Sequence, residues 1–185
     1  AADAENKFGR GSMLHNMFAT VATVIDEVGL VDVYAVALDD NASGTAAGAT
    51  VTLSGQVATA RAFALYIGGV QVQAAASVGD TAAALATKLA AAINANTALP
   101  VSAAAAEGVV TITSRHKGEA ANGLEVAWHY YDGDELPNGI GFTITGASNG
   151  VGKPSGGTGN PKVAQALAAV AEAWFYSVAF PYTDE

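Results

Sequence analysis

The feature that most limits the fold is a central region, residues 45–149, in which short β-rich runs are separated by Gly and Asn. The runs with strand patterning are "ATVTLSG", "AFALYIGGVQVQ", "GVVTITS", "LEVAWHYY" and "GFTITG". Residues 81–94 differ, because Leu85, Leu89 and Ile93 share one helical face behind Asp80 as the predicted N-cap. The region is therefore predicted to be a β-rich domain, sandwich- or barrel-like, with one helix packed on it.

Both ends of the chain have a different pattern, in which a helix is followed by a strand. Residues 13–28 form a predicted amphipathic helix with Ser12 as N-cap, and the apolar run "VDVYAVAL" at 31–38 predicts a strand buried on both faces. Near the other end, Asn160 caps a predicted helix over 161–174, and "FYSVAF" is the predicted strand that follows. A parallel pair built from these strands should have a right-handed crossover.

These two patterns together predict a mixed α+β chain. Residues 1–44 and 151–185 are assigned to a small α/β core, and residues 45–150 to a β-rich domain inserted into it. The stretches "DDNASGTAAG" and "SNGVGKPSGGTGNP" bracket the insertion. An insertion of this kind is tolerated because the entropy cost of closing a loop grows slowly with loop length.

Composition excludes several classes of partner. Eight Lys and Arg against 17 Asp and Glu give a net charge of -9, which repels nucleic acid and anionic lipid. No apolar run is long enough to span a bilayer, so membrane insertion is not expected. The chain has no Cys, which excludes disulfides and thiolate metal sites. The first residues, "AADAENKFGRG", contain no Met, so we expect a fragment of a longer protein.

Five blocks of sequence, in order along the chain, carry a resemblance to a known family. They are "FGRGSMLHNM" at 8–17, "LYIGGVQVQ" at 65–73, "GDTAAALATKLAAAINA" at 79–95, "LPVSAAAAEGVVTITSRHKGE" at 99–119 and "FPYTD" at 180–184. By these blocks the chain resembles the tail sheath proteins of Mu-like contractile phages. The blocks cover nearly the whole chain.

The resemblance implies a structural protein with no enzymatic activity and no cofactor. Sheath subunits of this family polymerise around a tail tube and shorten to drive it through a bacterial envelope. The implied partners are therefore other sheath subunits and the tail tube protein, and the implied location is the phage tail after synthesis in the host cytoplasm. Family members continue well past the last block, so we expect a truncated fragment that is a monomer or a weak oligomer by itself.

The most catalytic-looking string is "TSRHKGEAANG" at 113–123, which places Arg115, His116 and Lys117 together. No partner acid or nucleophile accompanies the His at a recognisable spacing. The string follows a predicted strand and contains turn formers, so we interpret it as a corner between a strand and a loop. Family members tend to have Gly-Asn near this point, whereas Ala121 precedes Asn122 here, which leaves the turn geometry open.

The stretch "YYDGDELPNG" at 130–139 gathers three carboxylates, of Asp132, Asp134 and Glu135. Their spacing does not fit an EF-hand, and Asp-Gly and Pro-Asn-Gly are turn sequences, so a solvated hairpin loop is predicted and no metal site. We hypothesise that Arg115 and Lys117 of one subunit contact these acids of a neighbouring subunit. No catalytic, cofactor-binding or metal-binding residue is predicted.

An alternative function is a binding module, in which the β-rich domain recognises a glycan or receptor on the host surface. An exposed aromatic platform would support it, and the candidates are Trp128, Tyr130 and Tyr131. An enzyme of the phosphate-binding kind is disfavoured because the Gly-rich stretch at 149–161 matches neither nucleotide fingerprint.

Overall fold

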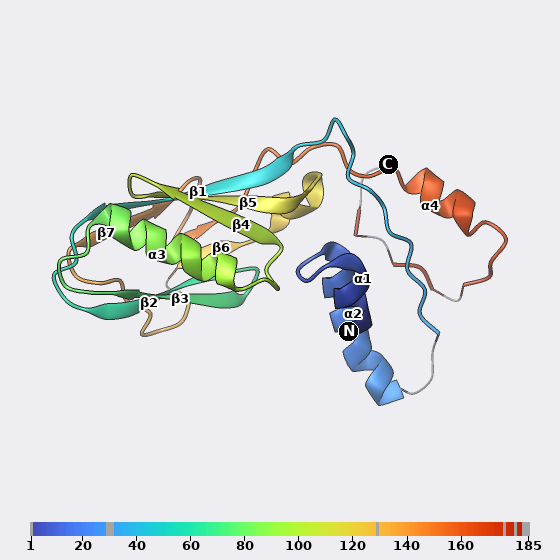
Figure 1. Ribbon diagram of the computed structural model, residues 1–185, viewed down its shortest axis with the longest axis horizontal. Coiled ribbons are helices and arrows are strands. Elements are labelled where there is room, and N and C mark those ends of the chain that lie inside the picture. The colour runs from blue at the N-terminus through green and yellow to red at the C-terminus, as the bar shows by residue number, and fades with distance from the viewer. Residues whose placement is uncertain (1, 29–31, 129, 176, 180, 183–185) are drawn as a thin grey trace.

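The computed structural model describes residues 2–28, 32–128, 130–175, 177–179 and 181–182 (Figure 1). Its helices are α1 (Ala2–Phe8), α2 (Met13–Val28), α3 (Ala82–Ala95) and α4 (Val163–Ala169), with a 3-10 turn η1 (Glu119–Gly123). Its strands are β1 (Ala46–Gly55), β2 (Arg61–Ile67), β3 (Val70–Ala76), β4 (Val101–Ala106), β5 (Val109–Lys117), β6 (Val126–Trp128), β7 (Ile140–Ile144) and β8 (Val151–Gly152). The predicted mixed α+β class is confirmed. No helix in the described ranges is long and apolar enough to cross a membrane.

The strands form two four-stranded antiparallel sheets, with the orders β4-β5-β1-β7 and β3-β2-β6-β8. β1 lies inside the first sheet between β5 and β7, and β2 and β3 form a hairpin. Isolated bridges extend the pairing of β1 outward to Thr45 and Thr158. We call residues 45–158 the β body, and we call the described residues of 2–44 and 159–182 the flanking segments. Figure 1 shows the β body on the left and the flanking segments on the right.

One apolar core lies between the two sheets and beneath α3. Side chains with no exposed surface come from both sheets and from the helix: Val51, Ile112, Leu65, Ile67, Leu85, Leu89 and Ile93. The predicted inward face of the helix is confirmed. Because full burial of each Leu or Ile contributes about 1.5–3 kcal/mol, this core is the main source of stability in the β body.

The start of α3 differs from the prediction by one residue. Thr81 is the N-cap, and its hydroxyl accepts a hydrogen bond from the Ala84 amide at 3.3 Å. Asp80 was predicted for this role, but its carboxylate accepts from the Ser77 amide at 2.7 Å and from Lys88 Nζ at 2.6 Å. The carboxylate is thus used by the preceding turn, and the prediction for Asp80 is wrong.

β4, which was not predicted, depends on contacts rather than on its own sequence. Its residues "VSAAAA" are mostly Ala, which is depleted in strands. β5 pairs with one edge of β4. On the other edge, the Asn94 side chain donates to the Ala103 carbonyl at 2.7 Å and accepts from the Ala103 amide at 2.9 Å. The Asn94 amide therefore takes the place of a neighbouring strand.

The strand predicted at 31–38 is wrong for the residues that the structure describes. Residues 32–38 form no strand, and Val31 lies outside the described part of the chain. Val33, Tyr34 and Val36 are 39%, 73% and 40% exposed. All pairings between the named strands are antiparallel, so the predicted parallel pair and its crossover do not occur in the described residues. The apolar pattern of a buried strand is present, but no strand among the described residues pairs with it.

The predictions for the last helix and strand are also wrong in detail. α4 is shorter than the predicted 161–174, and its N-cap is Lys162 instead of Asn160. The Asn160 side chain accepts a hydrogen bond from the Glu119 amide at 2.7 Å, so it is not available for the helix. Within "FYSVAF", residues 175 and 177–179 form no strand, and residues 176 and 180 lie outside the described part.

The prediction for α2 is confirmed at its bounds and at its N-cap. The Ser12 hydroxyl accepts from the His15 amide at 3.1 Å. The turn before α2 lies against the β body at Gly11, whose φ is +79°. A Cβ atom at Gly11 would lie 2.5 Å from the Thr97 carbonyl oxygen and 2.7 Å from that of Leu99, so only Gly fits this close approach.

Candidate functional site

The chain enters and leaves the β body side by side. Thr45 and Thr158 exchange two backbone hydrogen bonds, of 3.0 and 3.2 Å, and Gly48 and Ser155 exchange two more, each of 2.9 Å. We call residues 40–48 and 155–160 the stem. The Gly-rich stretch that brackets the C-terminal side of the predicted insertion therefore contributes to a paired structure.

The predicted basic cluster lies at the end of β5, beside the stem. The Lys117 amide donates to an Asp40 carboxylate oxygen at 3.0 Å, and Lys117 Nζ donates to the Ala42 carbonyl at 3.1 Å. Arg115 is exposed, and its Nε donates to the Leu99 carbonyl at 3.1 Å. The two cations thus have different surroundings: Lys117 holds the incoming stretch of the stem, and Arg115 faces solvent.

His116 lies between these two cations and is partly buried. Its Nδ1 is buried without a hydrogen-bond partner among the described residues. Burial lowers the pKa of His116, and the carboxylate of Asp40 raises it in part. A general base needs a partner that orients its ring, and Nδ1 has none in this part of the chain. The arrangement favours a neutral His that packs against the stem.

The rest of the string "RHKGEAANG" holds the outgoing stretch of the stem. Gly118 has a φ of +109°, and a Cβ atom there would lie 2.4 Å from Asn160 Oδ1. The Asn122 side chain donates to the Gly157 carbonyl at 2.9 Å and accepts from the Gly157 amide at 3.0 Å. The predicted corner between strand and loop therefore braces both stretches of the stem.

The predicted acidic residues lie elsewhere, on the loop between β6 and β7. This loop joins strands of different sheets, so the predicted hairpin is wrong. One Asp134 oxygen accepts from the amides of Tyr130 and Tyr131 at 3.1 and 2.9 Å, and the other accepts from the Tyr66 hydroxyl at 3.4 Å. Glu135 forms an exposed ion pair with Arg61.

Two tyrosines of this loop, Tyr130 and Tyr131, contact Tyr66 of β2. The rings of Tyr130 and Tyr131 are 4.9 Å apart between centroids, and they lie 5.2 and 5.5 Å from the ring of Tyr66. Tyr66 is buried, and Gln71 Nε2 donates to its hydroxyl at 2.9 Å. Removal from water raises the pKa of Tyr66, as does Asp134, whereas the Gln71 hydrogen bond lowers it. The Tyr66 hydroxyl therefore stays protonated at neutral pH and can donate to Asp134.

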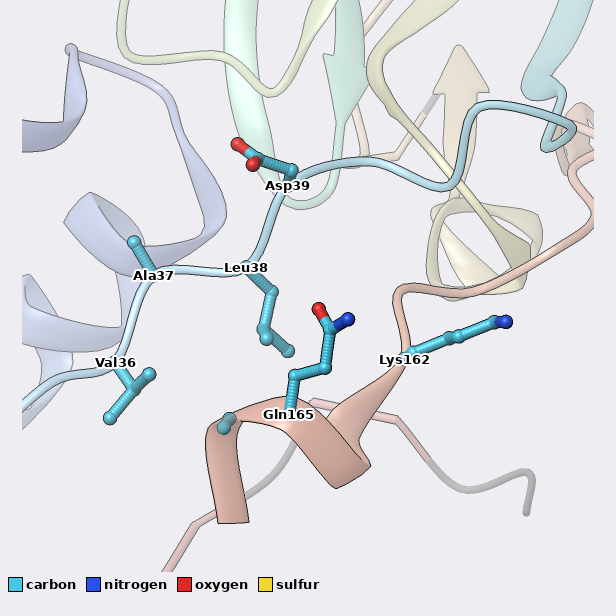
Figure 2. A pocket seen from close by; sticks show the side chains of 7 residues that line it. Val36, Ala37, Leu38, Asp39, Lys162 and Gln165 are labelled. Atoms are coloured by element: carbon cyan, nitrogen blue, oxygen red, sulfur yellow. The ribbon is translucent and has the colours of Figure 1, made fainter. Parts of the chain in front are cut away.

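Among the described residues, no group of His, Asp and Glu side chains has the geometry of a metal site. A small hollow of about 180 Å³ lies between residues 36–39 and α4. Figure 2 shows Leu38 and Gln165 pointing toward each other across this hollow, while Lys162 points away from it. It is an open space between two segments of the flanks, and its lining contains both polar and aliphatic side chains.

Sequence reasoning missed four residues that organise these places: Tyr66, Gln71, Asn122 and Asn160. For Asn122 a signal existed, since the sheath family tends to have Gly-Asn near this point and Asn122 matches the Asn of that pair. For Tyr66 and Gln71 the signal was weaker. They alternate with buried residues of β2 and β3, and they face each other only because the hairpin register pairs them.

No family model matches the chain. The chain is 34% identical over 183 residues to the Mu-like prophage FluMu tail sheath protein of Haemophilus influenzae. The alignment covers 99% of this chain and 36% of that protein, so the chain spans about a third of the length of its relative. Over nearly its whole length the chain is therefore similar to part of a phage tail protein. That relative is a Mu-like tail sheath protein, so the resemblance carried by the five blocks is confirmed.

Proposed function

We propose that the chain is part of a sheath subunit that polymerises around a tail tube and contracts to drive the tube through a bacterial envelope. The relationship to a tail sheath protein supports this function. In the proposal the chain is not an enzyme and needs no cofactor. Its partners are other sheath subunits and the tube protein, and it is made in the host cytoplasm and ends in the virion. The chain by itself is a monomer or weak oligomer.

The observation that carries the proposal is the exposed apolar surface of the flanking segments. Its members are Val21, Val24, Val33, Tyr34, Val36, Leu167, Trp174, Phe175 and Val178. Trp174 is fully exposed. Large apolar side chains left exposed on the same segments are typical of surfaces that another chain or domain covers. In the proposal, residues 1–44 and 151–185 are part of an α/β core that the rest of the subunit and its neighbours complete, and residues 45–150 are a domain inserted into it.

Contraction requires subunits to exchange one set of contacts for another of lower free energy. The stem supports a model in which the β body moves as a rigid unit and the flanking segments change their contacts. Lys117 bonds to Asp40 and Ala42, and the Asn160 side chain accepts from the Glu119 amide, so in this proposal the β body follows the flanks as one piece. In this proposal, the contacts that change lie on the flanking segments.

The surroundings of the basic and acidic residues limit which of them could form the proposed contact between neighbouring subunits. Lys117, Asp134 and Glu135 already have partners within the chain. Arg115 and Asp132 are exposed. The proposed contact is therefore strongest for Arg115 with Asp132. Full-length protein carrying Arg115→Glu and Lys117→Glu should assemble poorly, and assembly at the wild-type salt dependence would contradict this contact.

Electron microscopy of the full-length protein, expressed with its tube protein, tests the main proposal. Hollow sleeves or striated tails are expected, and their consistent absence would overturn it. Two matched variants locate the contacts. Val36→Asp, in the flanks, should abolish the sleeves, whereas Val70→Asp, in the β body at 44% exposure against 40% for Val36, should leave them. Sleeves formed equally by both variants would show that residues 33–36 take no part.

A further inference from the structure

The loop between β6 and β7 presents two tyrosines that are exposed but held in place. Tyr130 and Tyr131 are 54% and 61% exposed. Their backbone amides are fixed by Asp134, and their rings rest on the buried Tyr66. Ordering a surface loop opposes binding, and here that ordering is complete before any ligand arrives. The two rings are thus a preorganised aromatic surface, which we call the tyrosine patch.

A hollow lined by amide side chains adjoins the tyrosine patch. It has a volume of about 380 Å³ and lies between the free edge of β3 and the end of α3. Its lining residues are Gln71, Val72, Gln73, Ala92, Ala95 and Asn96. Gln71 belongs to both places, because its Nε2 also donates to the Tyr66 hydroxyl at 2.9 Å. Gln71 therefore connects the hollow to Tyr66, the residue on which the two exposed rings rest.

We infer that the tyrosine patch and this hollow bind a neutral oligosaccharide. The faces of a sugar ring carry C–H bonds, which pack against aromatic rings, and its hydroxyls form hydrogen bonds with amide and carboxylate groups. Tyr130 and Tyr131 supply the rings. Gln71, Gln73 and Asn96 supply both donors and acceptors. Trp128, the third residue considered from the sequence, is half-buried against Phe142 and does not contribute.

Charge decides which sugars fit. Asp132 and Asp134 lie on the loop, and Arg61 is occupied by Glu135. An anionic sugar would approach these carboxylates, and Arg61 is already paired with Glu135, so its binding is unfavourable. Asp134 already accepts hydrogen bonds and Glu135 is already paired, which leaves the exposed Asp132 as the carboxylate of the loop that a cationic group could reach. The site therefore favours neutral sugars over anionic ones.

A protein partner fits the tyrosine patch less well. The centres of protein interfaces are apolar and poor in charge, with aromatic anchors surrounded by further apolar contacts. Here the two rings are bordered by carboxylates and amides. Such a surface resembles the polar, shallow sites that hold hydroxyl-rich ligands.

The test uses the 185-residue chain and three probes: the neutral trisaccharides chitotriose and maltotriose, and the anionic 6'-sialyllactose. Saturation-transfer NMR and calorimetry should detect at least one neutral trisaccharide, bound more tightly than sialyllactose. Amide shifts in the wild-type chain should change at Tyr130, Tyr131 and Gln71. These shifts test the site without any substitution, so they hold even if a variant misfolds.

Variants then distinguish binding at the tyrosine patch from nonspecific binding at any exposed tyrosine. Tyr131→Ala should weaken binding by about tenfold or more, the usual effect of removing an aromatic anchor. Tyr131→Phe should keep most of the affinity, because it keeps the ring. Tyr34→Ala, at an even more exposed tyrosine in the flanking segments, should have no effect.

Several results would overturn the inference. They are no binding of either neutral trisaccharide, stronger binding of sialyllactose, shifts away from the patch, or equal losses in Tyr34→Ala and Tyr131→Ala. Self-association of the chain that disappears in Tyr131→Ala would identify the patch as a protein contact instead. None of these results bears on sheath assembly, which is measured separately by microscopy.

Discussion

The β body and the flanking segments both contain many large apolar side chains, but these are buried in the β body and exposed in the flanks. In the β body, Leu65, Leu89 and Ile112 have no exposed surface. In the flanks, Tyr34 is 73% exposed and Trp174 is fully exposed. Hydrophobic composition is therefore not enough to make a core. The β body has two facing sheets and a helix that enclose its apolar residues, whereas the described residues of the flanks form helices and extended chain that leave many large apolar side chains exposed.

The largest expected effect tests whether stability resides in the β body. Leu89→Ala should lower the free energy of unfolding by about 2–5 kcal/mol, because it leaves a cavity beneath α3. Leu167→Ala, at a residue of α4 that is 49% exposed, should change it by about 0.5 kcal/mol or less. Urea unfolding of both variants measures the difference. Equal losses would mean that the flanks share the core, and the comparison would fail.

A second substitution separates the two regions without unfolding either. Gly11→Ala places a Cβ atom against the carbonyls of Thr97 and Leu99 and strains a positive φ. Amide exchange in α2 should become about tenfold faster or more, which corresponds to about 1.4 kcal/mol, while β1 and β5 stay protected. Gly9→Ala is the matched control, since Gly9 has a similar φ of +81° but open space around it. Equal effects of both substitutions would show that docking against the β body is not what requires Gly11.

A third substitution tests the stem that joins the regions. Asn122→Ala removes both hydrogen bonds to Gly157 and should lower the free energy of unfolding by about 1–3 kcal/mol. Hydrogen exchange at the Gly157 amide should also accelerate. Asn138→Ala, at an exposed Asn with one long hydrogen bond to Thr59, is the control and should have little effect. Protection at Gly157 that survives in Asn122→Ala would show that backbone pairing alone holds the stem.

The smallest expected effect concerns pH at the same place. Burial lowers the pKa of His116 below its ordinary value near 6.5, so the folded chain favours the neutral ring. As the pH falls through that ordinary value, the unfolded chain takes up the proton first, and the free energy of unfolding decreases. Urea midpoints at about pH 7.5 and about pH 5.5 should differ less in His116→Gln than in the wild type. An unchanged difference would mean that His116 does not contribute.

The parts predicted correctly are those in which a local pattern and its packing agree. α2, α3 and the runs that became β1, β2, β3, β5 and β7 all have the period of the element they form. Leu85, Leu89 and Ile93 have helical spacing in the sequence, and all three belong to the same core in the structure. The sequence pattern and the packing therefore agree. The sequence also indicated correctly that Arg115, His116 and Lys117 end a strand.

The predictions were wrong where the structure of a segment depends on contacts with residues outside that segment. β4 is a strand because β5 and Asn94 pair with its two edges, which its Ala residues do not reveal. Residues 32–38 have strand patterning but no neighbouring strand, so the prediction was wrong. Asn160 has the sequence of a helix cap, yet Glu119 uses its side chain across the stem. The tyrosine patch needed the register of the β2–β3 hairpin, which the sequence does not give.

The exchange of hydrogen bonds between Thr45 and Thr158 has an evolutionary consequence. It brings the two ends of a segment of more than one hundred residues to the spacing of paired strands, about 5 Å. A segment whose ends meet in this way can be enlarged, shortened or exchanged for another without displacing what lies on either side. We therefore expect relatives of this chain to differ more in the length of the segment between Thr45 and Thr158 than in the residues on either side of it.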